Sequence, residues 1–127
     1  MHIKAIHHIA IICSDYNRSK RFYTEILGAS VLRETWRPQR QSYKLDLRLG
    51  NAQLELFSFP QPPPRPTRPE ACGLRHLALA VDSLEEAVNH LNSQGISVEP
   101  IRLDELTNRR FTFFQDPDGL PLELYEA

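Results

Sequence analysis

Short apolar runs alternate with polar positions along this chain, and the pattern occurs twice. The segment HHIAIICSD at 7–15 is echoed by RHLALAVDS at 75–83, and each gives a histidine, an apolar run and an aspartate. Short runs of this kind, bounded by turn residues, predict β-strands. The chain is therefore predicted to contain two copies of one structural unit.

Each of these strands is followed by a helical pattern. In the first copy an apolar stripe lies between Asp15, an N-cap candidate, and Gly28, a C-cap candidate. In the second copy the stripe lies between Ser83, with a glutamate three residues later, and Gly95. Such capping residues mark the beginning and the end of a helix.

Three strand-like runs follow each predicted helix. They are ASVLRETW, SYKLDLRLG and AQLELFSF in the first copy, and ISVEPIRL, RRFTFFQD and LPLELYE in the second. Turn signals separate them, among them DPDG at 116–119. Each copy is thus predicted to be a β-α-β-β-β module, the first at about 4–59 and the second at about 73–127.

A proline-rich segment joins the modules. Residues 60–69 read PQPPPRPTRP, with six prolines in ten positions, which excludes a helix or a central strand. We expect a stiff, extended linker at 60–70 inside a single domain of residues 1–127. A proline-rich ligand for an SH3 or WW domain is the alternative, but the spacer role already explains the composition.

The composition is that of a soluble globular protein, with 41% apolar and 24% charged residues among 127. The net charge of -1 argues against binding nucleic acid or a membrane surface. The N-terminal MHIKAIHHIA has no signal-peptide pattern, and no apolar run is long enough to span a membrane. We therefore expect a cytoplasmic protein in which Cys13 and Cys72 are reduced.

Four polar residues stand in two-fold register. His8 precedes Glu55 by 47 positions, and His76 precedes Glu123 by the same number. Strand parity places each pair on the face away from the helix, if the first and last strands of a module are neighbours. Glutamates flanked by leucines are costly to bury unless a cation compensates them. The pattern predicts a site for a divalent metal, and a polar pocket without metal is the alternative.

The same parity assigns further residues to this cleft face. His7 has the opposite parity, so we expect it on the helix side or at the surface. Lys44 or Arg48 is a candidate to pair with an anionic group of a substrate, with a solvated edge face as the alternative. The remaining residues assigned to the face are Ile12, Asp46, Phe57, Phe59, Ala78, Ala80, Arg110, Thr112 and Tyr125.

The segment RETWRPQRQ at 33–41 contains Trp36 and three arginines. It could form a mobile flap over the cleft, or a surface loop with Trp36 at a dimer interface. Tryptophan and arginine are enriched at interfaces, which favours the second interpretation.

These motifs resemble the vicinal oxygen chelate superfamily, which includes glyoxalase I, methylmalonyl-CoA epimerase, fosfomycin thiol transferases, extradiol dioxygenases and bleomycin-binding proteins. The resemblance rests on HHIAIICSD, RFYTEILG, LELF, RHLALAVD and DPDGLPLELYE, which together span nearly the whole chain. It implies an α+β fold in which two paired βαβββ modules form an open, barrel-like sheet around a metal cleft. A partner chain often completes the site, so a homodimer is expected.

The resemblance also implies an activity. Bacterial glyoxalase I uses His, Glu, His and Glu as metal ligands, and His8, Glu55, His76 and Glu123 fall on those positions. This implies a lactoylglutathione lyase-like lyase or isomerase in which Zn, Ni or Co, with Mn or Fe as alternatives, stabilises an enediolate. Glu123, or else Glu55, would be the catalytic base. The expected ligand is a small-molecule substrate, bound by Arg48, Lys44, Phe57, Phe59, Thr112 and Tyr125.

Two positions depart from the glyoxalase I pattern. Ile12 stands where bacterial glyoxalase I has an arginine that helps to hold glutathione, and Phe59 stands where a family asparagine is expected. These departures argue against glutathione as the thiol. Two other classes stay open: an Fe(II) ring-cleaving dioxygenase, which normally uses three protein ligands, and a non-catalytic small-molecule binding or resistance protein.

Overall fold

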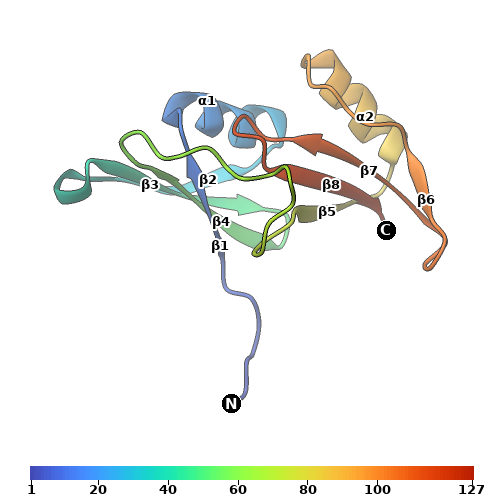
Figure 1. Cartoon of the computed structure of the whole chain (residues 1–127), viewed down its shortest axis with the longest axis horizontal. Coiled ribbons are helices and arrows are strands. Elements are labelled where there is room, and N and C mark those ends of the chain that lie inside the picture. The colour runs from blue at the N-terminus through green and yellow to red at the C-terminus, as the bar shows by residue number, and fades with distance from the viewer. The chain divides into compact units, whose positions relative to one another are not determined.

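The chain forms two compact units, Met1–Pro63 and Pro64–Ala127, in a computed structural model that describes residues 1–127. Each unit contains one four-stranded mixed sheet with a helix against one face (Figure 1). The predicted α+β fold with two β-α-β-β-β modules is confirmed, as two separate open sheets that do not close into a barrel. None of its helices has the length and apolar character needed to cross a membrane.

The first unit follows the predicted order of elements. Its sheet order is β1-β4-β3-β2, with β1 parallel to β4 and the other neighbours antiparallel. A π-helical turn at Phe22–Ile26 continues the short first helix. The elements are β1 (Ile9–Cys13), α1 (Tyr16–Arg21), β2 (Ser30–Arg37), a 3-10 helix (Pro38–Arg40), β3 (Ser42–Leu49) and β4 (Ala52–Ser58).

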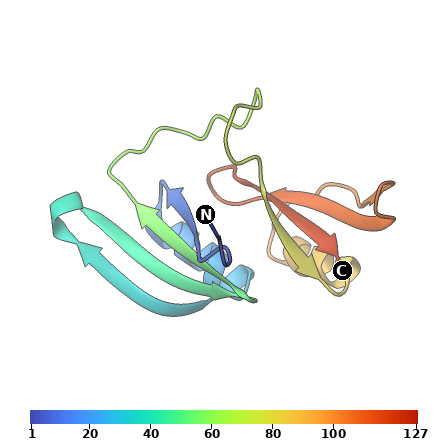
Figure 2. The same cartoon turned by 90° about the horizontal axis from the view of Figure 1, so that it is seen from below.

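The second unit repeats this topology. Its sheet order is β5-β8-β7-β6, and β5 runs parallel to β8, as Figure 2 shows from a second direction. The elements are β5 (Leu77–Val81), α2 (Leu84–Ser93), β6 (Arg102–Asp104), β7 (Arg109–Gln115) and β8 (Pro121–Glu126).

The predicted helix caps are present. The Asp15 carboxylate accepts a hydrogen bond from the backbone N–H of Arg18, and the Ser83 hydroxyl accepts one from the backbone N–H of Glu86. Both bonds satisfy backbone donors that the first turn of a helix leaves unpaired. Gly95 has a φ of 76°, a left-handed conformation that glycine adopts without steric cost at the end of α2.

One face of each sheet carries the hydrophobic core. In the first unit, Tyr23 and four leucines of β3 and β4 are almost completely buried. In the second unit, Leu122 and Leu124 of β8 are buried together with Leu84 and Leu91 of α2. Strand alternation therefore turns Glu55 and Glu123, which stand between these leucines, toward the opposite face.

Two segments differ from the sequence prediction. The run ISVEPIRL was expected to be a full strand, but only Arg102–Asp104 pairs with β7. Pro100 has no backbone N–H to donate to a ladder, so the chain before Arg102 stays irregular. The segment 33–41 is not a loop, because β2 continues to Arg37 before the 3-10 helix; half-exposed Trp36 packs on the ring of Tyr43.

The proline-rich segment contains neither helix nor strand, and the division between the two units falls inside it. Its second half is fastened to the second unit. The Arg65 guanidinium donates to the carbonyl oxygen of Leu74 at 2.6 Å, and the Thr67 hydroxyl donates to that of Gly119 at 3.2 Å. Residues 65–67 are thus part of the surface of this unit as well as part of a linker.

A substitution in the core of the second unit tests whether Leu122 is packed there. Replacement Leu122→Ala should lower the free energy of unfolding by about 2–5 kcal/mol, because it removes buried methyl groups and leaves a cavity. Urea unfolding followed by circular dichroism measures this change. The control Leu106→Ala, at a side chain that is fully exposed, should change stability by less than about 0.5 kcal/mol. Equal effects of the two changes would contradict the assignment of Leu122 to the core.

Candidate functional site

Each unit brings one histidine next to one glutamate, and it does so by the same backbone register. Ala10 of β1 pairs with Glu55 of β4, and Ala78 of β5 pairs with Glu123 of β8. Each histidine lies two residues before the paired alanine, just ahead of its strand. His8 Nε2 lies 3.5 Å from Glu55 Oε2, and His76 Nε2 lies 2.9 Å from Glu123 Oε2.

Both carboxylates are shielded from water. The side chains of Glu55 and Glu123 are only 8% and 14% exposed. A carboxylate that loses its hydration shell needs a compensating cation or several hydrogen-bond donors. The neighbouring histidine is one such partner, and it compensates the charge only when it is protonated.

The pair in the first unit has a lysine and a second acid beside it. Lys44 Nζ lies 3.7 Å from Glu55 Oε1 and 3.4 Å from Asp46 Oδ1. Asp46 pairs with Glu55 across β3 and β4, and its buried Oδ1 makes no hydrogen bond. One lysine thus faces two buried carboxylates, so this cluster carries excess negative charge when His8 is neutral.

The pair in the second unit has aromatic surroundings instead. Phe113 of β7 stands directly opposite Glu123, and the ring of His76 meets the Phe113 ring edge-on at 5.1 Å. His76 is the only basic side chain within ion-pair distance of Glu123. The two pairs are therefore alike in geometry but differ in their electrostatic environment.

The donor set fits a divalent metal of the predicted kinds. Each unit offers one imidazole nitrogen and one carboxylate within 3.5 Å of each other, and both carboxylates are short of positive charge. Imidazole with carboxylate suits Zn, Co, Ni, Mn and Fe. Within either unit, no group of three or more histidine, cysteine, aspartate or glutamate side chains is placed to hold a metal ion.

Most of the other predicted cleft residues lie on the expected faces. Lys44 and Arg48 pair with Phe57 and Gln53 across β3 and β4, so they share the face of Glu55. Ile12 pairs with Phe57 from β1 on the same face. His7 is exposed, as expected for a surface residue. Its Nδ1 lies 2.8 Å from Nδ1 of His8.

Aromatic rings extend these faces in both units. The ring of Phe59 is stacked with that of Phe57, with centroids 6.2 Å apart, and the Arg37 guanidinium lies over the Phe57 ring. Tyr125 pairs with Ala80 and with Phe111, on the face of Glu123. Neither Arg37 nor Phe111 was predicted from the sequence to lie on these faces.

The assignment of Thr112 and Arg110 to the cleft face is wrong. Thr112 pairs with Leu124, is fully buried on the core side, and donates its hydroxyl to the carbonyl oxygen of Glu99 at 2.6 Å. Arg110 bonds Glu85 of α2 and Glu126 of β8. The polar character of these residues suggested an open face, but specific partners on the helix side satisfy them.

The residues of β7 that lie on the face of Glu123 are Phe111 and Phe113, and not Arg110 and Thr112 as predicted. The run RRFTFF has apolar residues at both parities, so periodicity alone does not fix its register. The LEL motif at 122–124 assigns Glu123 to the open face, and the residue opposite Glu123 must share that face, but the motif does not identify this residue. Only the pairing of Phe113 with Glu123 establishes which residues line this face.

The chain matches the Glyoxalase/Bleomycin resistance protein/Dioxygenase superfamily over residues 5–124. It belongs to this superfamily, as the sequence motifs indicated. It is 65% identical to YwkD of Bacillus subtilis (strain 168), with 99% of each chain covered. It is 31% identical to a 2-epi-5-epi-valiolone epimerase of Actinomyces sp, over 94% of this chain and 78% of the epimerase. The crystal structure of a glyoxalase family protein from Enterococcus faecalis is 55% identical and superposes with a TM-score of 0.92, with 99% of this chain and 100% of that chain covered.

The Arg110 cluster has a measurable electrostatic consequence. Hydrogen bonds from the Arg110 guanidinium hold the pKa of Glu85 and of Glu126 below the ordinary glutamate value. Replacement Arg110→Gln should raise both pKa values, which NMR titration of the carboxyl carbons measures. Since the folded-state pKa values are lowered, the cluster stabilises the fold above the unfolded pKa of about 4.3, and this stabilisation disappears as the pH falls through the folded values. Unchanged pKa values in the variant would contradict the assigned contacts.

Proposed function

We propose that this protein is a metal-dependent enzyme that transfers a proton on a carbon next to a carbonyl group, as epimerases and glyoxalases of its superfamily do. The proposed ligands are His8, Glu55, His76 and Glu123. The observation that supports this most strongly is the repetition of one His–Glu arrangement by the same register in two units. The two pairs would come together within one chain or across two chains of a homodimer.

The bound cation would supply Lewis-acid chemistry, polarising a substrate oxygen so that the neighbouring C–H becomes acidic. Zn, Ni and Co are the expected metals, with Mn and Fe as alternatives. The residues of this chain would hold that cation, orient the substrate and move the proton. Catalysis of this kind needs a base within hydrogen-bond reach of the carbon acid.

Glu123 is the better candidate for the base. Glu55 is more deeply buried and has both Lys44 and His8 within ion-pair distance, so two partners restrain it. Glu123 has only His76, and its other neighbours, such as Phe113, cannot donate a conventional hydrogen bond. A carboxylate with fewer partners gives up fewer ion pairs and hydrogen bonds when it turns toward a substrate.

The sheet faces also indicate which substrate would be suitable. Phe57, Phe59 and Tyr125 would pack against a small carbon skeleton, while Lys44 and exposed Arg48 would attract an anionic or carbonyl oxygen. Ile12 cannot replace the arginine that helps glyoxalase I to hold glutathione. The likeness to a 2-epi-5-epi-valiolone epimerase agrees with a small oxygenated substrate in place of a glutathione adduct.

The metal content of the purified chain tests the ligand set. We expect about one divalent metal per four-ligand site, and replacement Glu123→Gln should lower the metal affinity at least tenfold, because an amide carries no negative charge. The control Glu105→Gln, at an exposed residue in the turn after β6, should leave metal content unchanged. Elemental analysis of protein purified without chelator or histidine tag measures both.

Two other outcomes of the elemental analysis would favour a different function. Iron as the only metal, together with oxygen uptake on catechols, would favour the ring-cleaving dioxygenase. No metal after reconstitution would contradict the enzyme and favour a protein that only binds a small molecule in the same cleft.

Kinetics separate the roles of the base and of the arginine. With hemithioacetals and acyl-CoA epimers as trial substrates, Glu123→Gln should reduce kcat by about 10²–10⁴-fold, even at a metal concentration that restores occupancy. Replacement Arg48→Ala should raise KM and leave kcat nearly unchanged, since it would remove an anchor and not the base. An unchanged KM for Arg48→Ala would remove Arg48 from the substrate site.

A further inference from the structure

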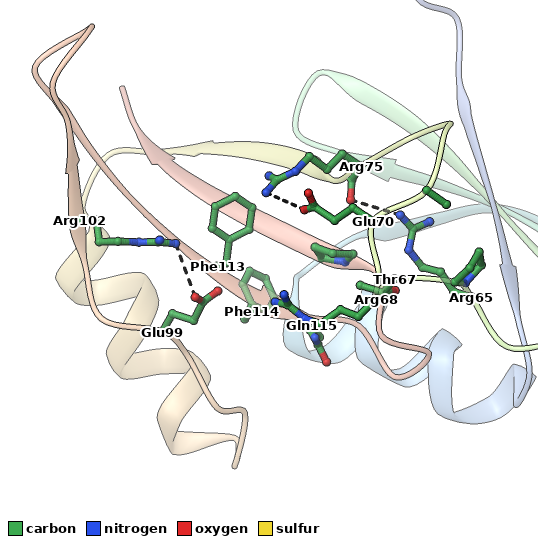
Figure 3. Close-up of a pocket in the computed structure, with 13 residues that line it drawn as sticks. Arg65, Thr67, Arg68, Glu70, Arg75, Glu99, Arg102, Phe113, Phe114 and Gln115 are labelled. Carbon is green, nitrogen blue, oxygen red and sulfur yellow. Dashed lines mark hydrogen bonds and ion pairs between the residues drawn. The ribbon is translucent and has the colours of Figure 1, made fainter.

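The second unit contains a cavity of about 170 Å³ that the proposed function does not use. The proline-rich segment forms one wall, the chain around Glu99 and Arg102 forms another, and the end of β7 forms the floor (Figure 3). In Figure 3, Arg102 and Glu99 lie at one end, Arg65, Glu70 and Arg75 at the other, and Phe113 lies between them. All lining residues belong to the same unit.

The charges that line the cavity do not balance. Four arginines and two glutamates contribute, and both glutamates are already paired: Glu70 with Arg75 at 2.8 Å and Glu99 with Arg102 at 3.6 Å. Arg65 and Arg68 have no carboxylate within ion-pair distance, which leaves two positive charges in excess. The cavity is therefore positively charged, although the chain as a whole has a net charge of -1.

One of the two unpaired arginines is already held in position. The Arg65 guanidinium donates to the carbonyl oxygens of Leu74 and Arg75, and its buried Nε has no hydrogen-bond partner. Arg68 makes no ion pair, so its donors are available. Guanidinium groups present several donors in a planar fork that matches the oxygens of a phosphate. The cavity is thus lined by one arginine that is held in position and one whose donors are free, which favours an anion with several oxygens.

The cavity also adjoins one of the His–Glu pairs. Arg75 Nη1 lies 3.3 Å from His76 Nδ1, and Phe113, on the cavity floor, packs against the His76 ring. An anionic group held in the cavity would therefore lie on the same side of the unit as Phe113, whose ring contacts that of His76. The cavity is smaller than the 300–1,000 Å³ or so of a typical ligand pocket, which suits one functional group and not a whole cofactor.

We propose that this pocket binds the dianionic group of a phosphate monoester or phosphonate, with Arg65 and Arg68 as its principal contacts. If the phosphate or phosphonate is part of a substrate, the assignment rests on the proposed function, because it presumes that chemistry takes place at His76 and Glu123. As a binding site for a tetrahedral dianion, it depends only on the pocket. The two can be tested separately.

The test uses the full chain and two probes, inorganic phosphate and methyl phosphate, titrated calorimetrically with chloride and acetate as comparison anions. We expect both phosphates to bind, and chloride and acetate to bind at least tenfold more weakly. Replacement Arg68→Gln should weaken phosphate binding about tenfold, the loss expected for a hydrogen bond to a charged group. The matched control Arg109→Gln, at an exposed arginine without an ion pair at the far end of β7, should bind as the unmodified chain does.

A further variant separates the pocket from the metal site. Glu123→Gln protein, treated with chelator, should retain phosphate binding that Arg68→Gln still weakens, even if the proposed metal site proves wrong. Loss of phosphate binding in chelated Glu123→Gln protein would show that the anion binds to metal and would overturn the pocket. Equal affinities for Arg68→Gln and the unmodified chain would also overturn it. If methyl phosphate binds at least as tightly as inorganic phosphate, the result supports an esterified phosphate as the ligand. If only inorganic phosphate binds, the assignment to a phosphate monoester is overturned.

Discussion

The arrangement of both units depends on a carboxylate placed between two buried leucines of a strand. Leu54 and Leu56 pack into one core, and Leu122 and Leu124 pack into the other, so alternation forces the intervening glutamate onto the opposite face. That glutamate is then largely removed from water, and its charge has to be met by something on the same face. In each unit the first partner is a histidine just ahead of the parallel neighbouring strand. The same leucines that define the two faces of the sheet therefore also define the position of each His–Glu pair.

The two copies have diverged around this shared constraint. In the first unit, Lys44 and Asp46 surround Glu55 with further charge. In the second unit, aromatic residues surround Glu123, and the charged groups gather instead at the end of β7, where Arg75 links them to His76. This division is consistent with one glutamate that serves mainly as a restrained ligand and another that moves a proton.

Much of the fold could be predicted because the local signals agree with one another. Asp15 and Ser83 cap the helices they were expected to cap, and strands β3, β4, β7 and β8 lie within a residue or so of their predicted ranges. Prediction failed where a residue has two reasonable environments. Thr112 and Arg110 are polar and were placed on the open face, yet a backbone carbonyl and two glutamates satisfy them on the helix side. The segment 33–41 was expected to form a flap or a surface loop, although the strand-like run ASVLRETW already reached Trp36, and β2 continues to Arg37.

The two β-α-β-β-β modules and the equivalence of His8–Glu55 with His76–Glu123 could be predicted without a structure, because both follow from spacing and from the alternation of a strand. Which side chains surround each pair depends on the packing of the folded chain. The approach of Lys44 and Asp46 to Glu55, the Phe113 ring against His76 and the fastening of Arg65 to the carbonyl oxygens of Leu74 and Arg75 bring together residues from different strands and loops. Their proximity depends on sheet register and loop path, and these are set by the packing of whole elements and not by any local pattern.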